Sequence, residues 1–170
     1  FILLVERENG DARNTLSWRS QKVENLDMVI KMAQDQILQD EHASRVCNLH
    51  LPDDIPTIKA DMTYLQVIIR ELIDNAVKFS EDPVDLYVTE ENNHVCIKVV
   101  DQGRGIPQDE RENIWKKFYQ INREKTEDQG AGSGLTLIKG LTEIQGGYVD
   151  LDSEEGVGST FCVFMPILTE

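Results

Sequence analysis

Residues 61–79 read DMTYLQVIIRELIDNAVKF, and the spacing of the apolar residues in this stretch predicts a helix. Asp61 is a suitable N-cap, because a carboxylate at that position accepts hydrogen bonds from the first backbone N–H groups of a helix. Most of the side chains that follow are apolar. The polar residues among them therefore need an explanation.

Three polar residues of this helix fall in one row. Glu71, Asn75 and Lys78 are spaced so that they project within an arc of about 60°. Mg²⁺ prefers oxygen ligands and keeps most of its water, so one protein oxygen such as the Asn75 amide is enough to hold it. A lysine one turn further on can meet a phosphate as a point charge. A solvated helix face is the alternative interpretation of the row.

A second polar segment, Asp101-Gln-Gly103-Arg-Gly105-Ile, follows an apolar stretch that is typical of a central strand. A carboxylate in this position can accept a hydrogen bond from an exocyclic amine. Glycines two and four residues later allow the backbone to approach a ligand closely. The alternative is an ordinary turn at the end of a strand.

A third segment, Gly130-Ala-Gly132-Ser-Gly134-Leu135, leads into an expected helix. The N-terminus of a helix offers unpaired N–H groups to a phosphate. Neither of two familiar phosphate motifs fits, because Leu135 replaces the last glycine of a dinucleotide fingerprint and Leu135-Thr136 replaces the Lys-Ser/Thr of a P-loop. A flexible hinge is the alternative.

The remaining sequence predicts an α+β fold with strands in hairpins, in which helices cover one face of a mixed sheet. Residues 11–21 are polar and irregular. We expect a short helix at 107–117, followed at 118–134 by a long loop of the kind that is often functional. We expect long helices at 23–38, 61–79 and 135–145, and strands at 46–51, 84–88, 94–101, 148–152 and 160–165.

Composition restricts the possible functions. The formal net charge of -14 argues against direct binding of nucleic acid or an anionic membrane, which usually needs a positive field. The three cysteines are far apart and indicate buried thiols in a reducing compartment. The opening apolar run, residues 1–5, is too short to span a bilayer, and the chain starts without Met, so we expect a piece of a longer protein.

Taken together, five segments in this order resemble the conserved boxes of sensor histidine kinases, within the GHKL or Bergerat class of ATP-binding domains. They are Glu71–Phe79, Asp101–Ile106, Phe118, Gly130–Leu135 and Gly156–Phe161, with Ser159 in the last of them. The resemblance implies a two-layer α/β sandwich over residues 22–170, the catalytic ATP-binding domain. It also implies that residues 1–21 are the end of a dimerisation-hairpin helix and its linker.

The resemblance also implies roles for these residues, with ATP and Mg²⁺ as cofactors. Asn75 would hold Mg²⁺, Glu71 would act as the catalytic acid or base, and Lys78 would meet the phosphates. Asp101 would accept a hydrogen bond from the adenine amine, next to Gly103 and Gly105. The implied nucleotide-binding set is completed by a lid anchor and by residues of the two remaining glycine segments: Phe118, Gly130, Gly132, Gly134, Leu135 and Ser159.

Two residues depart from the family pattern. Ser133 stands where Leu is usual, and Gln120 stands where an Arg commonly follows the anchor Phe. Without that Arg, Arg123 or Lys125 would have to make the γ-phosphate contact. None of the histidines, His42, His50 and His94, lies in a context like that of the family's acceptor histidine, so the chain should bind ATP but lack its own acceptor.

The expected partners are therefore the dimerisation hairpin of a homodimeric parent kinase and the receiver domain of a response regulator. We expect a cytoplasmic domain, whether or not the parent is membrane-bound. Two alternatives stay open: an ATPase of the same fold, in which water is the acceptor and Glu71 the base, and a degenerate module that binds nucleotide weakly. The sequence does not reveal the signal, the cognate regulator, or whether phosphorylation occurs within or across the dimer.

Overall fold

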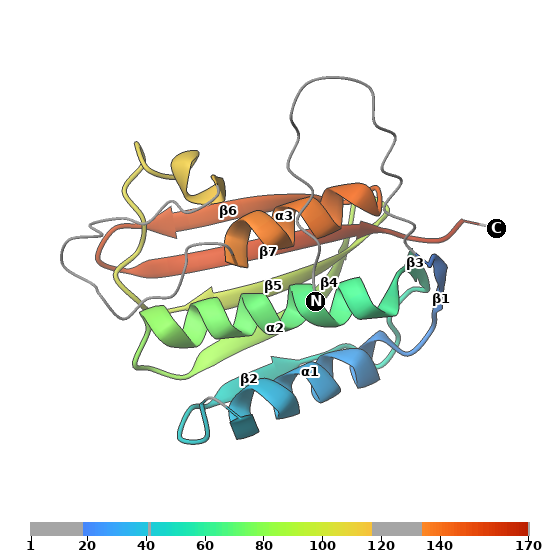
Figure 1. Ribbon diagram of the computed structural model, residues 1–170, viewed down its shortest axis with the longest axis horizontal. Helices are drawn as coiled ribbons and strands as arrows, with labels where there is room; N and C mark the ends of the chain where they lie inside the picture. The colour runs from blue at the N-terminus through green and yellow to red at the C-terminus, as the bar shows by residue number, and fades with distance from the viewer. Residues whose placement is uncertain (1–18, 41, 117–133, 170) are drawn as a thin grey trace.

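The computed structural model describes residues 19–40, 42–116 and 134–169. Figure 1 shows the elements in chain order. They are β1 (Gln21–Val23), α1 (Leu26–Asp40), β2 (Cys47–His50), β3 (Ile58–Ala60), α2 (Met62–Phe79), β4 (Val84–Glu91), β5 (His94–Asp101), the 3₁₀ helix η1 (Asn113–Trp115), α3 (Gly134–Ile144), β6 (Tyr148–Glu154) and β7 (Gly158–Pro166).

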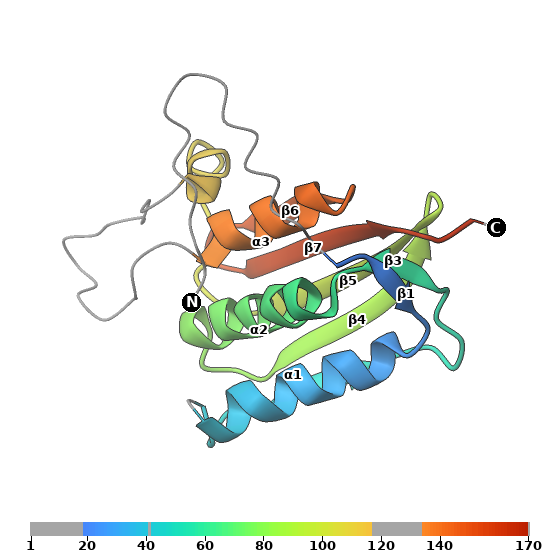
Figure 2. The same cartoon turned by 45° about the vertical axis from the view of Figure 1, so that its right-hand side comes forward.

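A five-stranded mixed sheet with strand order β2-β4-β5-β7-β6 forms one layer. β2 pairs with β4 in parallel, and the other neighbouring pairs are antiparallel. All three α-helices lie on the same face of this sheet, as the two views of Figure 1 and Figure 2 show. The expected α+β class, with helices on one face of a mixed sheet, is confirmed.

The core lies between the sheet and the helices. Along β4, Leu86 is fully buried whereas its neighbour Tyr87 is 37% exposed, as expected for a strand with one covered face. Ile69 and Ile73 of α2 are fully buried and belong to the same apolar cluster as Leu86. The alternation predicted for residues 84–88 therefore sets which face of the sheet the helices cover.

A second, two-stranded sheet was not expected from the sequence. β1 pairs antiparallel with β3, and Val23 lies opposite Ile58. The helix predicted from Val23 consequently begins later, at Leu26, and runs to Asp40. Each strand of this pair has only three residues, too few for a periodic pattern, so only the long-range pairing reveals it.

The helix predicted for residues 107–117 is wrong. The Glu110 N–H donates to the Pro107 carbonyl at 3.0 Å and the Asn113 N–H to the Glu110 carbonyl at 2.9 Å. These i to i−3 bonds close successive turns, and the only helical segment in the described part of this stretch is the 3₁₀ helix η1. The expected arrangement of strands in hairpins is confirmed for β4 and β5, which pair antiparallel, and Asn92 and Asn93 between them have φ values of 49° and 62°.

The termini of the helices follow local chemistry. Asp61 has extended backbone angles and its Oδ1 accepts hydrogen bonds from the N–H groups of Thr63 and Tyr64, at 2.9 and 3.2 Å. Asp61 is thus the N-cap of α2, as predicted. Within the described ranges, no helix combines the length and apolar character that crossing a membrane requires.

The cap gives a prediction on stability. Asp61→Ala should lower the free energy of unfolding by about 1–2 kcal/mol, because it removes the cap and leaves the N–H groups of Thr63 and Tyr64 without their acceptor. Asp61→Asn, which keeps a side-chain acceptor, should cost less. Urea denaturation followed by circular dichroism measures both, and an alanine variant as stable as the wild type would contradict the assigned cap energy.

Candidate functional site

The C-terminal end of β5 brings together the segments that sequence analysis singled out. Asp101 is the last residue of β5, pairs with Ser159 of β7 and is 4% exposed. Its Oδ1 accepts a hydrogen bond from the Gly103 N–H at 2.9 Å. A carboxylate is therefore held at the strand end by the loop that follows it.

The loop after Asp101 is packed too closely for side chains. A methyl group on Gly103 would lie 2.2 Å from the backbone oxygen of Phe79, at the end of α2. Gly105 has a φ of 66°, and a methyl group there would lie 1.9 Å from the backbone oxygen of Glu154. The loop thus contacts both the end of α2 and the β6–β7 hairpin, which only glycine permits at these positions.

A serine missed by the sequence reasoning ties the same loop to the hairpin. The Ser153 hydroxyl accepts a hydrogen bond from the Ile106 N–H at 2.8 Å and donates to the Gly158 carbonyl at 3.0 Å. It also lies 2.9 Å from the Ser159 hydroxyl. Arg111 donates to the Ser153 carbonyl. A single serine on an alternating strand gives no sequence signal, so only the fold reveals this role.

Burial determines the electrostatics of Asp101. Desolvation raises the pKa of its carboxyl group above the ordinary value of 3.8, and hydrogen bonds from the backbone at Gly103 and Ser159 oppose the rise. Asp101 therefore contributes to folding stability below that ordinary value, and this contribution is lost as the pH rises through the raised pKa. A hydrogen bond that Asp101 accepts from an amine becomes stronger when the carboxyl group is ionised, so a higher pH favours it.

The polar row of α2 lies beside the start of α3. A methyl group on Gly134, the first residue of α3, would lie 2.7 Å from Glu71 Oε2. The side chain of Asn75 is half-buried and has no hydrogen-bond partner among the described residues. Lys78 is exposed, and its ammonium group lies 2.5 Å from Asp74 Oδ2. The segments of Glu71 and Gly134, 63 residues apart by number, thus meet in the fold.

The other predicted site residues divide into two groups. Leu135 is half-buried and packs against the core rather than standing free. Thr136, one residue later, donates to the Trp115 carbonyl at 3.0 Å and so fixes the start of α3 to η1. Phe118, Gly130 and Gly132 lie outside the described residues, as do Gln120, Arg123, Lys125 and Ser133.

Comparison with known proteins identifies the class. The family model described as "Histidine kinase-, DNA gyrase B-, and HSP90-like ATPase" matches residues 60–169, and the chain belongs to this family. The circadian input-output histidine kinase CikA of Synechococcus elongatus is 37% identical over 122 residues, which are 70% of this chain and 16% of that protein. The alginate biosynthesis sensor protein KinB of Pseudomonas aeruginosa is 28% identical, over 98% of this chain and 28% of that protein.

Solved structures agree on the fold. Full-length ShkA in complex with AMPPNP is 27% identical, with a TM-score of 0.76 over 91% of this chain and 32% of that chain. The catalytic domain of the histidine kinase ThkA, in a nucleotide-free form, has a TM-score of 0.73 over 88% of this chain and 96% of that domain, at 18% identity. The chain therefore matches nearly the full length of that solved domain in fold but spans only a minor part of the curated relatives.

The close approach at Gly105 gives a second prediction. Gly105→Ala should lower the free energy of unfolding by about 2–4 kcal/mol, since it adds both a strained φ and a clash with the Glu154 backbone. Gly140→Ala is the matched control, because nothing lies within 4 Å of a methyl group at this position in α3. Thermal unfolding should show the control to be unchanged or slightly stabilised; equal losses in both variants would contradict the assigned contact.

Proposed function

We propose that this chain is the ATP-binding catalytic domain of a sensor histidine kinase, which positions Mg²⁺-ATP for γ-phosphoryl transfer to a histidine on a dimerisation hairpin. The observation that carries the proposal is the meeting of the predicted segments. Asp101, its glycine loop and Ser159 lie at the end of β5, next to the end of α2. Glu71 of α2 lies against the first residue of α3.

In this proposal the base-recognition group is Asp101. The carboxylate is nearly withdrawn from water, so a hydrogen bond to an adenine amine would face little competition from solvent. Gly103 and Gly105 allow the loop beside it to fold closely onto the backbone of Phe79 and Glu154, which holds the carboxylate in place. The buried Ser153–Ser159 pair supports the same loop from the hairpin.

The side chains present fit a magnesium ion that is bound mainly by the phosphates of the nucleotide and by water, with few protein ligands. Within the described residues no cluster of three or more His, Cys, Asp or Glu side chains could hold a metal by itself. The Asn75 amide, unpartnered among those residues, supplies one oxygen, and Mg²⁺ usually takes its remaining ligands from phosphates and water. Bound in this way, the ion would neutralise charge that develops on the transferred phosphoryl group.

The residues around Asn75 have distinct proposed tasks. Glu71 would act as the acid or base, or order the water of the ion, beside the N–H groups at the start of α3. Lys78 would place its charge at the phosphates. Phe118 would anchor the lid. The lid would hinge at Gly130, Gly132 and Gly134, which would also offer N–H groups to the triphosphate, and Leu135 and Ser159 would complete the set.

The partners and location follow from the same proposal. The acceptor would be a histidine of the dimerisation hairpin in a homodimeric parent, and the product would pass to a receiver domain. All three cysteines are free, which supports placement of the domain in the reducing cytoplasm. CikA is named a histidine kinase, which favours a histidine acceptor over the water acceptor of an ATPase.

Asp101 gives the first functional test. Asp101→Ala should weaken ATP binding by about 10- to 150-fold, because it removes a charged hydrogen bond worth about 1.5–3 kcal/mol. Asp152→Ala, which removes an exposed carboxylate of β6, should leave the affinity unchanged. Isothermal titration calorimetry measures both, and an unchanged affinity of the Asp101 variant would remove its assignment.

Asn75 gives the second functional test. Asn75→Ala should reduce phosphoryl transfer to an added acceptor hairpin by on the order of 100-fold or more, because the only protein oxygen proposed for the ion is lost. The control is Asn48→Ala on β2, which removes an exposed amide that donates to Asp85. Formation of phosphohistidine over time is the measurement, and full activity of the Asn75 variant would refute its role as ligand.

A further inference from the structure

A single carboxylate on α2 connects Lys78 to a histidine from a distant part of the chain. Asp74 Oδ2 lies 2.5 Å from the ammonium nitrogen of Lys78, and Asp74 Oδ1 lies 2.8 Å from Nε2 of His42. The side chains of His42 and Asp74 are only 18% and 14% exposed. Both oxygens of Asp74 are therefore engaged, in a place that water reaches only partly.

The position of Asp74 explains how it reaches both partners. It precedes Asn75 by one residue, so at 100° per residue it lies beside the row of Glu71, Asn75 and Lys78, about 60° from Glu71. Lys78 follows Asp74 by four residues, which brings the two side chains together on the helix surface. His42 comes from the segment between α1 and β2 and contacts α2 from outside the row.

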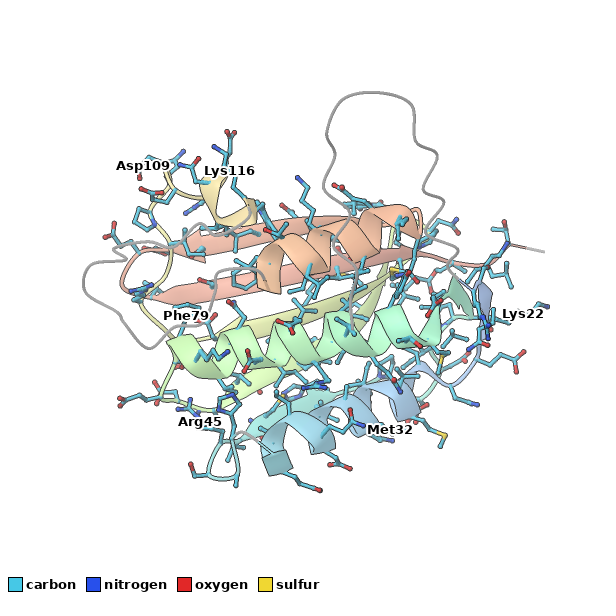
Figure 3. All side chains as sticks on the ribbon, in the orientation of Figure 1. Lys22, Met32, Arg45, Phe79, Asp109 and Lys116 are labelled. Carbon is cyan, nitrogen blue, oxygen red and sulfur yellow. The ribbon has the colours of Figure 1, made fainter. Side chains whose placement is uncertain are left out.

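The segment that carries His42 is itself fixed to α2. The Arg45 N–H donates to the His42 carbonyl at 2.8 Å, which closes a turn. The Arg45 side chain donates to the carbonyl of Ser80, the residue that caps the end of α2. Figure 3 shows Arg45 near the same end of α2 as Phe79. His42 and Arg45 together hold this turn against the half of α2 that carries the polar row.

We infer that His42 and Asp74 are positioning residues for nucleotide binding, which hold the Lys78 ammonium group in place for the phosphates. The inference rests on the function proposed above, because it assumes that Lys78 meets a phosphate. Asp74 restrains the ammonium group, and His42 fixes the orientation of the Asp74 carboxylate. His42 thus has a proposed task that is unrelated to phosphoryl acceptance.

The physical reason lies in the lysine side chain. A lysine has a flexible four-carbon stem, and ordering that stem on binding costs conformational entropy. Its ammonium group has three donors, so one bond to Asp74 leaves two for phosphate oxygens. A lysine that is already restrained loses less entropy when the ligand arrives, which strengthens binding without any new contact.

The test uses the whole chain and compares the affinities for Mg²⁺-ATP and for adenosine by calorimetry. His42→Ala should weaken ATP binding by roughly three- to tenfold, the range expected for one lost hydrogen bond, and leave adenosine binding unchanged. His42→Gln, which keeps a side-chain donor, should restore most of the ATP affinity. His50→Ala is the matched control, because it removes a 2.7 Å contact between a histidine and Asp85 on another part of the sheet.

A double-mutant cycle separates positioning from a general structural effect. In a Lys78→Met background, His42→Ala should weaken ATP binding no further, because the group that it positions is gone. The inference is overturned if His42→Ala leaves ATP affinity unchanged, weakens ATP and adenosine binding equally, or adds its full effect to Lys78→Met. Lack of ATP binding by the wild type would overturn the proposed function as well, whereas normal wild-type binding with any of these outcomes overturns only the positioning role.

Discussion

The buried carboxylate of Asp101 needs hydrogen bonds in place of water, and the loop after β5 and the neighbouring strand β7 are arranged to supply them. A carboxyl group with so little exposure is costly to ionise unless hydrogen bonds compensate for the lost water. The Gly103 N–H and the backbone at Ser159 supply such bonds. To bring Gly103 back onto Asp101, the chain must turn sharply, and the turn presses the loop against the backbone of Phe79. One buried charge thus links β5, β7 and the end of α2.

A second buried carboxylate organises the opposite end of α2. Asp61 accepts hydrogen bonds from the Arg19 N–H at 2.7 Å and from the first turn of α2, and its own N–H donates to Gln145 at 2.8 Å. Gln145 directly follows α3, whose first residue lies against Glu71. α2 and α3 therefore run antiparallel, with contacts at Asp61 and at Glu71. Arg19, before β1, therefore bonds to the residue that caps α2, and that residue in turn bonds to the residue that follows α3.

The sequence predicted what local chemistry determines. The cap at Asp61, the three α-helices and the strands of the main sheet all carry short-range or periodic signals. Four glycine-rich or polar segments, together with Phe118, also predicted the family from their order and spacing. The 3₁₀ helix η1 was missed, because Pro107 permits a helix start without requiring that the helix continue.

Contacts between distant residues could not be predicted in this way. The pairing of β1 with β3 joins strands of three residues each, which are too short to show a period. Ser153 has its role only because the loop after β5 folds onto the β6–β7 hairpin. His42 and Asp74 are separated by 32 positions, and no residue pattern around either of them indicates that the two side chains meet. One sequence without homologues holds no signal for such pairs.

The net charge of the chain poses a last physical question, since a domain of charge -14 is proposed to bind a polyanion. Fields between exposed charges fade over about 8 Å at physiological ionic strength, so the groups nearest the ligand decide the outcome. Lys78 lies in the polar row, and the Arg104 guanidinium lies 5.1 Å from the centre of the Phe79 ring. Acidic side chains gather instead around a hollow beside the start of α1, lined by Glu24, Asp27, Asp53 and Asp54. In the proposed function, the local arrangement of cations, the N-terminus of α3 and the proposed magnesium ion, rather than the total charge, would therefore determine whether a triphosphate is held.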